Sequence, residues 1–333
     1  MLQVIARRLR VPLLVVAALL AIPAGADTVY VTSFTTGELI SYESSDPTGT
    51  KTVLLPGGSL VSPGALVFGP DGNLYIGENG DGSTFAPRIS KYEPATLTLS
   101  TVYPFGSFEV FPGSLVFQGN DLLIGRNPFF SNTGPIVKLA NATGGLLALS
   151  DYTTGGSLAS SPGLALAADG RLYVSDQTYD FVSGIASGPV KRFDAAGTYV
   201  GEVITDGGSG LAGPTGLAII GTTLYTASIM NGAILQTDLS TDITTAFATT
   251  GTAFEVGSVA PLSDGGLLAG SPSGSGNIYR FSSNGTLLGT FASGLGQIGG
   301  ITTSAVPEPA AAQLGCGVLA VAAWLIHRHG RAA

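Results

Sequence analysis

The stretch Ser161-Pro-Gly-Leu-Ala-Leu-Ala-Ala-Asp-Gly-Arg-Leu-Tyr-Val-Ser-Asp176 contains the structural unit that repeats along this chain. It predicts two short β-strands, 163–167 and 171–175, joined by a tight turn in which a glycine supplies the positive φ. The same unit recurs along the chain, and the first strand of each copy begins at a glycine. The six glycines are 49, 50, 53, 41 and 43 residues apart: Gly64, Gly113, Gly163, Gly216, Gly257 and Gly300.

Each of the first five copies continues into a second strand, a third and a fourth that leads to the next glycine. The sixth copy has only its first strand, whereas 28–32 and 39–43 match the second and third strands. Periods of this length are typical of propeller blades. We therefore predict an all-β fold, a six-bladed β-propeller of four-stranded antiparallel blades, whose N-terminal strands close the ring by pairing with the last blade. An unclosed solenoid or a sandwich would not explain the permuted last copy.

Both ends of the sequence have the pattern of processing segments. Three arginines precede the apolar run 11–22, and Ala24 and Ala26 are the small residues that signal peptidase requires, which predicts a signal peptide with a helical apolar run over 1–26. The propeller is then expected over 27–304. The tail 305–333 contains Pro307-Glu308-Pro309 and an uncharged stretch, 310–326, that includes Trp324. That stretch is long enough for a transmembrane helix.

The tail ends in a basic cluster that includes Arg328 and Arg331. A Pro-Glu-Pro motif, an apolar span and a basic end, in this order at the C-terminus, resemble the PEP-CTERM sorting signal. The resemblance implies a Gram-negative bacterium, an inner-membrane precursor cleaved by an exosortase, and a mature protein at the cell surface or in an extracellular matrix rich in exopolysaccharide. Signal peptidase and exosortase are the processing partners that we expect.

Composition restricts the chemistry of the domain between these segments. Five of the 14 Lys and Arg lie in 1–26 and 310–333 and none of the 22 Asp and Glu does, so 27–309 carries nine positive and 22 negative charges, or −13. Such a domain repels nucleic acid. It also contains no His, Cys or Trp. This excludes a Ser-His-Asp or Cys-His nucleophile, metal sites with imidazole or thiolate ligands, and disulfides.

The quoted repeat resembles the NHL-repeat and gluconolactonase-like six-bladed propellers. In the gluconolactonase-like enzymes, carboxylate and amide side chains just before the strand glycine hold a divalent metal. The corresponding residues in this chain offer no such group: Pro63, Pro112, Pro162, Thr215, Val256 and Gly299. The resemblance therefore implies the fold but neither this metal site nor a cofactor, and it leaves open only a calcium site built from other oxygens.

Charged and amide residues follow the second strands of three consecutive blades. Because adjacent strands are antiparallel, these residues are expected on the face where the first strands begin. Long loops on the same face carry aromatic residues, and aromatic rings beside polar groups suit a sugar or peptide ligand. The candidate ligand-binding residues are Glu78, Asn79, Arg126, Asn127, Phe130, Asp176, Gln177 and Tyr179. A packed loop cluster with internal ion pairs is the structural alternative.

Three functional hypotheses remain from the sequence. The first is an exported envelope or matrix propeller that binds exopolysaccharide, another glycan or a protein without catalysis. The second is a calcium-dependent lactonase or sugar lyase with Glu78 or Asp176 as acid or base and Arg126 as anion clamp. The third is a coat protein without a specific ligand.

Overall fold

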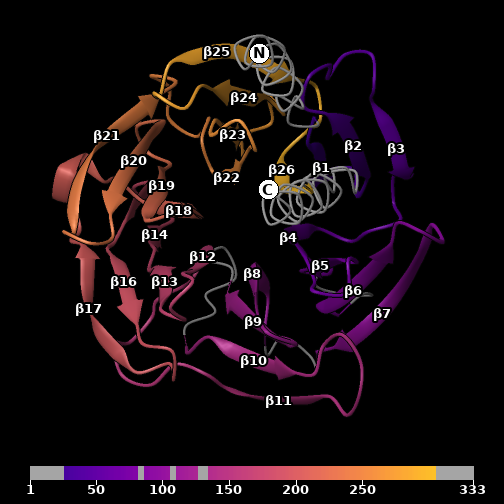
Figure 1. Ribbon diagram of the computed structural model, residues 1–333, viewed down its shortest axis with the longest axis horizontal. Helices are drawn as coiled ribbons and strands as arrows, with labels where there is room; N and C mark the ends of the chain where they lie inside the picture. The colour runs from indigo at the N-terminus through magenta and orange to yellow at the C-terminus, as the bar shows by residue number, and fades with distance from the viewer. Residues whose placement is uncertain (1–25, 82–85, 106–109, 127–133, 305–333) are drawn as a thin grey trace, which may run out of the picture. The chain divides into compact units, whose positions relative to one another are not determined.

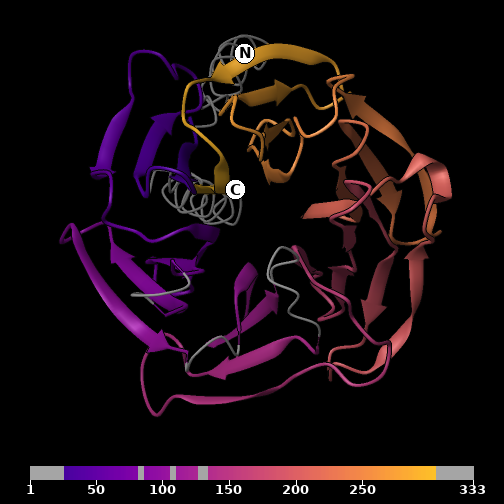
Figure 2. The ribbon, with the colours of Figure 1, turned by 180° about the vertical axis from the view of Figure 1, so that it is seen from behind.

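The computed structural model describes residues 26–81, 86–105, 110–126 and 134–304. Within the unit Asp27–Ser304, six four-stranded antiparallel sheets are arranged in a ring around a central axis, each with its first strand innermost (Figure 1). The view from behind in Figure 2 shows the same arrangement. The prediction of an all-β six-bladed propeller is confirmed.

The blades, numbered along the chain, follow the predicted repeat. Blade 1 contains β4 (Pro63–Phe68), β5 (Leu74–Glu78), β6 (Arg88–Glu93) and β7 (Thr98–Pro104). Blade 2 contains β8 (Pro112–Gln118), β9 (Asp121–Arg126), β10 (Val137–Ala140) and β11 (Ala148–Asp151). Blade 3 contains β12 (Gly163–Leu166), β13 (Leu172–Ser175), β16 (Val190–Phe193) and β17 (Tyr199–Ile204). Blade 4 contains β18 (Pro214–Ile220), β19 (Thr223–Ser228), β20 (Ala233–Asp238) and β21 (Ile243–Thr249), and blade 5 contains β22 (Ser258–Pro261), β23 (Leu267–Gly270), β24 (Ile278–Phe281) and β25 (Leu287–Ala292).

Blade 6 is built from both ends of the unit. Its strand order is β26 (Ile298–Ser304), β1 (Thr28–Ser33), β2 (Leu39–Glu43) and β3 (Thr52–Leu55). Strand β1 pairs antiparallel with β26, with Val31 opposite Ile301. The predicted closure of the ring by the N-terminal strands is therefore confirmed.

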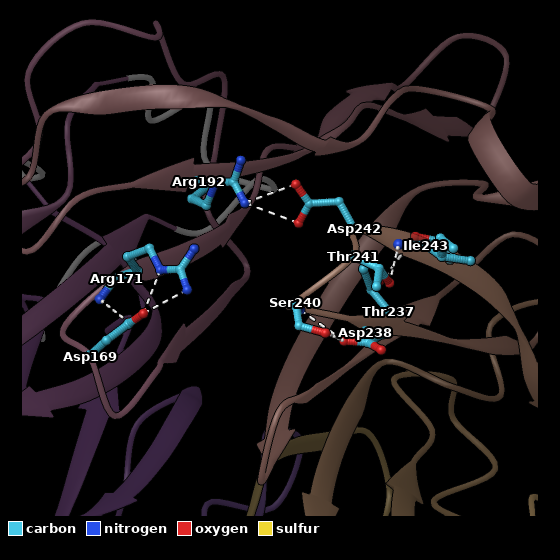
Figure 3. Close-up of polar contacts among 10 residues, drawn as sticks. Asp169, Arg171, Arg192, Thr237, Asp238, Ser240, Thr241, Asp242 and Ile243 are labelled. Carbon is cyan, nitrogen blue, oxygen red and sulfur yellow. Dashed lines mark hydrogen bonds and ion pairs between the residues drawn. The ribbon is translucent and has the colours of Figure 1, made fainter.

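The hydrophobic core consists of six clusters, and each joins two neighbouring blades. Edge-to-face aromatic pairs cross some of these boundaries, such as Tyr75 and Phe117, whose ring centroids are 4.9 Å apart. Polar pairs cross them too. Arg192 of blade 3 donates from Nη1 to both carboxylate oxygens of Asp242 in blade 4, at 3.0 and 3.1 Å (Figure 3). The described strands of the ring and its core thus lie entirely within Asp27–Ser304.

Glycine is required where the innermost strands of neighbouring blades meet. A Cβ at Gly163 would lie 1.9 Å from the carbonyl oxygen of Thr215. One at Gly216 would lie 2.8 Å from the carbonyl oxygen of Gly257, and one at Gly300 would lie 2.9 Å from the backbone nitrogen of Leu66. A side chain at these positions would push the neighbouring backbone away. This is a physical reason for glycine at the start of the repeat.

Candidate functional site

A cavity of about 680 Å³ opens along the axis of the ring, and all six blades line it. Every described residue in its wall is uncharged. The first strands begin and the second strands end around it, so its mouth lies on the face of the predicted long loops. The described residues around the mouth are Phe34, Gln177, Ile229, Phe254, Pro272, Ser273 and Gln297.

Farther along the inner strands, six aliphatic side chains surround the axis at one common register. They are Leu66, Leu115, Leu164, Leu217, Val259 and Ile301. Their exposed fractions fall between 6% and 8%, because each packs between blades and shows only an edge to the cavity. The cavity therefore has a mixed polar and apolar mouth, a glycine-rich wall and an apolar ring.

The residues that end the second strands hold the loops leading into their own blades. Ser33 Oγ donates to Leu295 O at 2.6 Å, Ser228 Oγ accepts from Ala212 N at 2.8 Å, and Ser271 Oγ donates to Phe254 O at 3.1 Å. Glu78 and Asp176, the candidates in blades 1 and 3, make the same kind of contact. Their shared role in the structure is to anchor loops.

Glu78 is completely buried. Its Oε2 accepts hydrogen bonds from Val61 N at 2.7 Å and from Arg88 Nη2 at 2.9 Å, and its Oε1 accepts from Arg88 Nε at 2.8 Å and from Ser90 Oγ. The hydrogen bonds to Glu78 raise the pKa of Arg88. All of these donors are protein groups, so the carboxylate of Glu78 stabilises the blade and its entering loop, and Glu78 does not line the cavity.

Asp176 is nearly as enclosed. Its Oδ1 accepts from Ala159 N at 2.7 Å, and its Oδ2 accepts from Lys191 Nζ at 2.6 Å. In blade 2 the residue at this position is Arg126, whose Nε donates to Pro135 O at 3.0 Å and whose pKa is lowered by burial. The three charged candidates therefore hold backbone atoms of the loops on the long-loop face.

In blades 1 and 3, the residue after the charged candidate is an amide: Asn79 follows Glu78, and Gln177 follows Asp176. Gln177 lines the cavity and donates from Nε2 to Pro214 O at 3.1 Å, which links blades 3 and 4. Asn79 is buried and donates from Nδ2 to Ser62 O at 3.1 Å, while its Oδ1 has no hydrogen-bond partner among the described residues. Of these two amides, Gln177 is the one in the cavity wall.

The connection after Gln177 forms an additional hairpin where the sequence predicted only a loop. It consists of β14 (Thr178–Asp180) and β15 (Ile185–Ser187). The rings of Tyr179 and Phe181 pack edge to face, 5.0 Å apart, and Phe181 and Val182 are 62% and 96% exposed. The hairpin thus carries an exposed apolar tip.

The hairpin is fixed beside the mouth of the cavity. A Cβ at Gly213 would lie 2.6 Å from Ala186 Cβ and 2.9 Å from Cγ2 of Ile229, a cavity-lining residue. Strand β15 and the cavity wall therefore lie against the same glycine. Gln177 and Tyr179 both belong to this corner of the mouth, and a role for them in ligand binding stays a prediction.

The residues just before the strand glycines, where the gluconolactonase-like enzymes have metal ligands, either line the cavity or are buried. Pro162, Thr215 and Gly299 line the cavity, whereas Pro63, Pro112 and Val256 are buried. In the part of the chain that the structure describes, no group of three or more His, Cys, Asp or Glu side chains gathers to hold a metal.

Several predicted residues lie outside the described ranges, so the structure places none of them. They are Asn127, Phe130, Ala24, Pro307, Glu308, Pro309, Trp324, Arg328 and Arg331. Ala26 is the first described residue. Within the described ranges, no helix has the length and apolar character needed to cross a membrane.

Sequence reasoning missed Phe254 and Ser273, which blade 5 contributes to the mouth, and the neighbouring carboxylate of Glu255, which accepts from Ser273 Oγ. Phe254 adopts φ 61°, a left-handed conformation that is uncommon for an aromatic residue, and it lines the cavity. The available signal was the alternation of serine at 271, 273 and 275 after a second strand.

The chain is similar to solved structures over most of its length. One, from a crystal structure of a nidogen/laminin complex, has 12% identity and a TM-score of 0.65, covering 84% of this chain and 98% of the other. Another, a protein of unknown function from Bacteroides caccae, has 13% identity and a TM-score of 0.59, covering 84% and 99%. No protein-family model and no curated protein matches the chain. Similarity at these identities shows the propeller fold alone.

Proposed function

We propose that this protein is an exported, non-catalytic binding propeller that takes a neutral glycan, such as an exopolysaccharide, at the mouth of its axial cavity. The observation that carries the proposal is the uncharged cavity beside the aromatic hairpin. Sugars offer apolar faces to aromatic rings and hydroxyls to amides. Gln177 supplies the amide, Tyr179 and Phe181 supply the rings, and Asn79 is a further amide candidate.

The candidate charges have indirect roles in this proposal. Glu78, Arg126 and Asp176 hold the loops around the mouth through the contacts described above, and these contacts are with protein groups. The excess of acidic residues in 27–309 favours a neutral polymer over an anionic one, because like charges repel. The alternative ligand is an envelope protein that inserts an uncharged loop into the cavity. The exposed apolar tip of the hairpin would also suit contact with a protein.

The export route is part of the same proposal. Residues 1–26 act as the signal peptide, and 305–333 act as a PEP-CTERM tail that anchors the precursor in the inner membrane until an exosortase cleaves it. The NHL-like repeat supplies the scaffold. The mature propeller then resides at the surface or in the matrix of a Gram-negative bacterium.

Calorimetric titration of Asp27–Ser304 with the neutral exopolysaccharide of the producing organism tests the proposal. We expect saturable heat that is the same in calcium and in EDTA and that Gln177→Ala and Tyr179→Ala each reduce. Absence of heat would overturn glycan binding, and heat only in calcium would favour the metal-dependent enzyme hypothesis. Asp169→Ala, in a turn on the opposite face, is the control that should bind normally.

A further inference from the structure

A cluster of oxygen atoms from blade 5 adjoins the mouth of the cavity. Glu255 Oε1 accepts from Ser273 Oγ at 2.9 Å, and Glu255 Oε2 accepts from Tyr279 OH at 2.7 Å. Ser271 Oγ and Ser273 Oγ are 2.7 Å apart, and Asn277 Nδ2 donates to Tyr279 OH at 3.0 Å. Ser273 is itself part of the cavity wall. The charge of this cluster is thus one carboxylate, held by hydroxyl groups beside an uncharged cavity.

Ser275 completes the cluster in a different way. Its Oγ lies 3.2 Å from both Glu255 Oε1 and Glu255 Oε2, and also 2.9 Å from Ser273 Oγ and 3.1 Å from Ser271 Oγ, so one hydroxyl is shared among several groups and reaches the carboxylate only at long distance. Ser275 is exposed, and it stands between Gly274, where an added Cβ would meet nothing within 4 Å, and Gly276. Shared, long hydrogen bonds are weaker than the short ones from Ser273 and Tyr279. The Ser275 hydroxyl is therefore the donor that an incoming hydroxyl can replace most easily.

The loops next to this carboxylate place an aromatic residue and an amide in the cavity wall. Phe254 precedes Glu255 and lines the cavity in its left-handed backbone conformation, a type of strain that is concentrated at functional sites. The neighbouring loop of blade 6 packs closely, since Leu295 N donates to Gly276 O at 3.3 Å and Gln297 lines the cavity. The loops of blades 5 and 6 that meet beside the Glu255 cluster therefore contribute Phe254 and Gln297 to the cavity wall.

We propose that Glu255 and Ser273, with Phe254 beside them, form a subsite that recognises a vicinal diol of a neutral sugar. The two diol hydroxyls donate to the two oxygens of Glu255 and displace Ser275, and the apolar face of the sugar packs on Phe254. This inference rests on the proposed glycan binding and specifies the chemical group that is read. It also gives a role to the carboxylate beside the uncharged cavity, since hydrogen bonds to an ionised acceptor are the stronger ones.

Four variants of Asp27–Ser304 test the subsite by calorimetry with oligosaccharides from partial hydrolysis of the neutral exopolysaccharide. We expect Glu255→Gln to raise Kd about tenfold to a hundredfold, the equivalent of losing hydrogen bonds to a charged group. Ser273→Ala should weaken binding less. Ser275→Ala should leave Kd unchanged or lower it, because its hydroxyl is displaced. Binding by Ser275→Ala that is as weak as binding by Glu255→Gln would mean that the cluster needs Ser275 in order to bind the sugar. That result would overturn the subsite.

Asp238→Asn is the fourth variant and the matched control. Asp238 Oδ1 accepts from Ser240 N at 2.8 Å and from Ser240 Oγ at 2.6 Å in a turn between β20 and β21, on the opposite face (Figure 3). The substitution neutralises a similar serine-bound carboxylate away from the cavity, so Kd should not change. Thermal unfolding of each variant separates loss of binding from loss of fold.

Periodate-treated oligosaccharide, in which vicinal diols are cleaved, is the chemical control and should lose binding to the wild type. Undiminished binding of the treated probe, or equal binding by wild type and Glu255→Gln, would overturn the subsite while leaving glycan binding intact. No response to the untreated probe would overturn both proposals. Heat from CaCl₂ alone that Glu255→Gln abolishes would assign the cluster to a cation and overturn the diol.

Discussion

Glu78 and Arg88 lie opposite each other at the paired ends of β5 and β6, and Arg88 Nε is 2.8 Å from Glu78 Oε1. Glu78 also accepts from Val61 N, and this contact fixes the loop that enters blade 1. A completely buried carboxylate is stable only because its oxygens have donors. The pair is therefore part of the scaffold that shapes the mouth of the cavity.

Removal of this carboxylate is expected to destabilise the propeller strongly. Glu78→Ala leaves the partly buried Arg88 without its partner, which should cost about 3–5 kcal/mol in the free energy of unfolding. Urea denaturation of Asp27–Ser304 measures it. The exposed pair between Asp169 and Arg171 is the control, and Asp169→Ala should change stability by no more than about 1 kcal/mol. Equal effects from both variants would contradict the scaffold role of Glu78.

The close approach of the inner strands gives a second prediction. Gly163→Ala would place a Cβ 1.9 Å from the carbonyl oxygen of Thr215, so the two strands must separate. We expect a loss of about 1–3 kcal/mol or more, as in other overpacked interiors. At Gly274 an added Cβ would meet nothing within 4 Å, so Gly274→Ala should be nearly neutral. Thermal unfolding compares the two, and an equally stable Gly163→Ala protein would refute the packing argument.

Closure of the ring by the two ends of the unit can be tested by truncation. Deleting 298–304 removes β26 and leaves β1 without its inner partner, which exposes an unpaired strand edge. The cluster that contains Val31 of blade 6 and Leu268 of blade 5 also loses Ile301. We expect this variant to lose cooperative unfolding, as followed by near-UV circular dichroism during urea denaturation. A cooperative transition at the wild-type midpoint would contradict closure by β26.

The pKa of Glu255 gives a prediction about pH. Burial acts to raise this pKa, but the hydrogen bonds donated by Tyr279, Ser273, Ser275 and Asn277 outweigh it, and the net shift is below the ordinary value of 4.5. A carboxyl with a lowered folded-state pKa contributes stability above 4.5, and the contribution is lost as pH falls through the folded-state value. The thermal stability of wild type relative to Glu255→Gln should therefore decline on acidification below pH 4.5. A difference that is constant with pH would show that the shift is absent.

The sorting tail can be tested without knowledge of the ligand. Replacing Pro307, Glu308 and Pro309 by alanine should leave an uncleaved form in the inner membrane of the producing organism. Fractionation and immunoblotting against the propeller measure the distribution. Alanine replacement of 48–50, at a turn of the propeller, is the control and should be released normally. Normal release of the Pro-Glu-Pro variant would refute exosortase processing.

The fold could be predicted because close approach of the inner strands requires glycine at positions such as Gly163 and Gly216, so glycine recurs in the sequence. Closure could be predicted because the second and third strands of the last copy stand at the N-terminus. The scaffold role of Glu78 could not be predicted, because its partner Arg88 lies ten residues farther along the chain, after a long connection, and the sequence does not show that the two residues are paired. The cluster around Glu255 was missed because it forms only when two loops of blade 5 meet.

Hydrogen–deuterium exchange of Asp27–Ser304, with and without the neutral oligosaccharide, shows whether the sugar binds at the mouth of the axial cavity. We expect slower exchange in 177–187, 254–258 and 271–277, which lie around the mouth of the cavity. The turns at 169–171 and 238–242, on the opposite face, should exchange at the same rate in both samples. Protection confined to those turns, or none at saturating oligosaccharide, would contradict binding at the axial cavity.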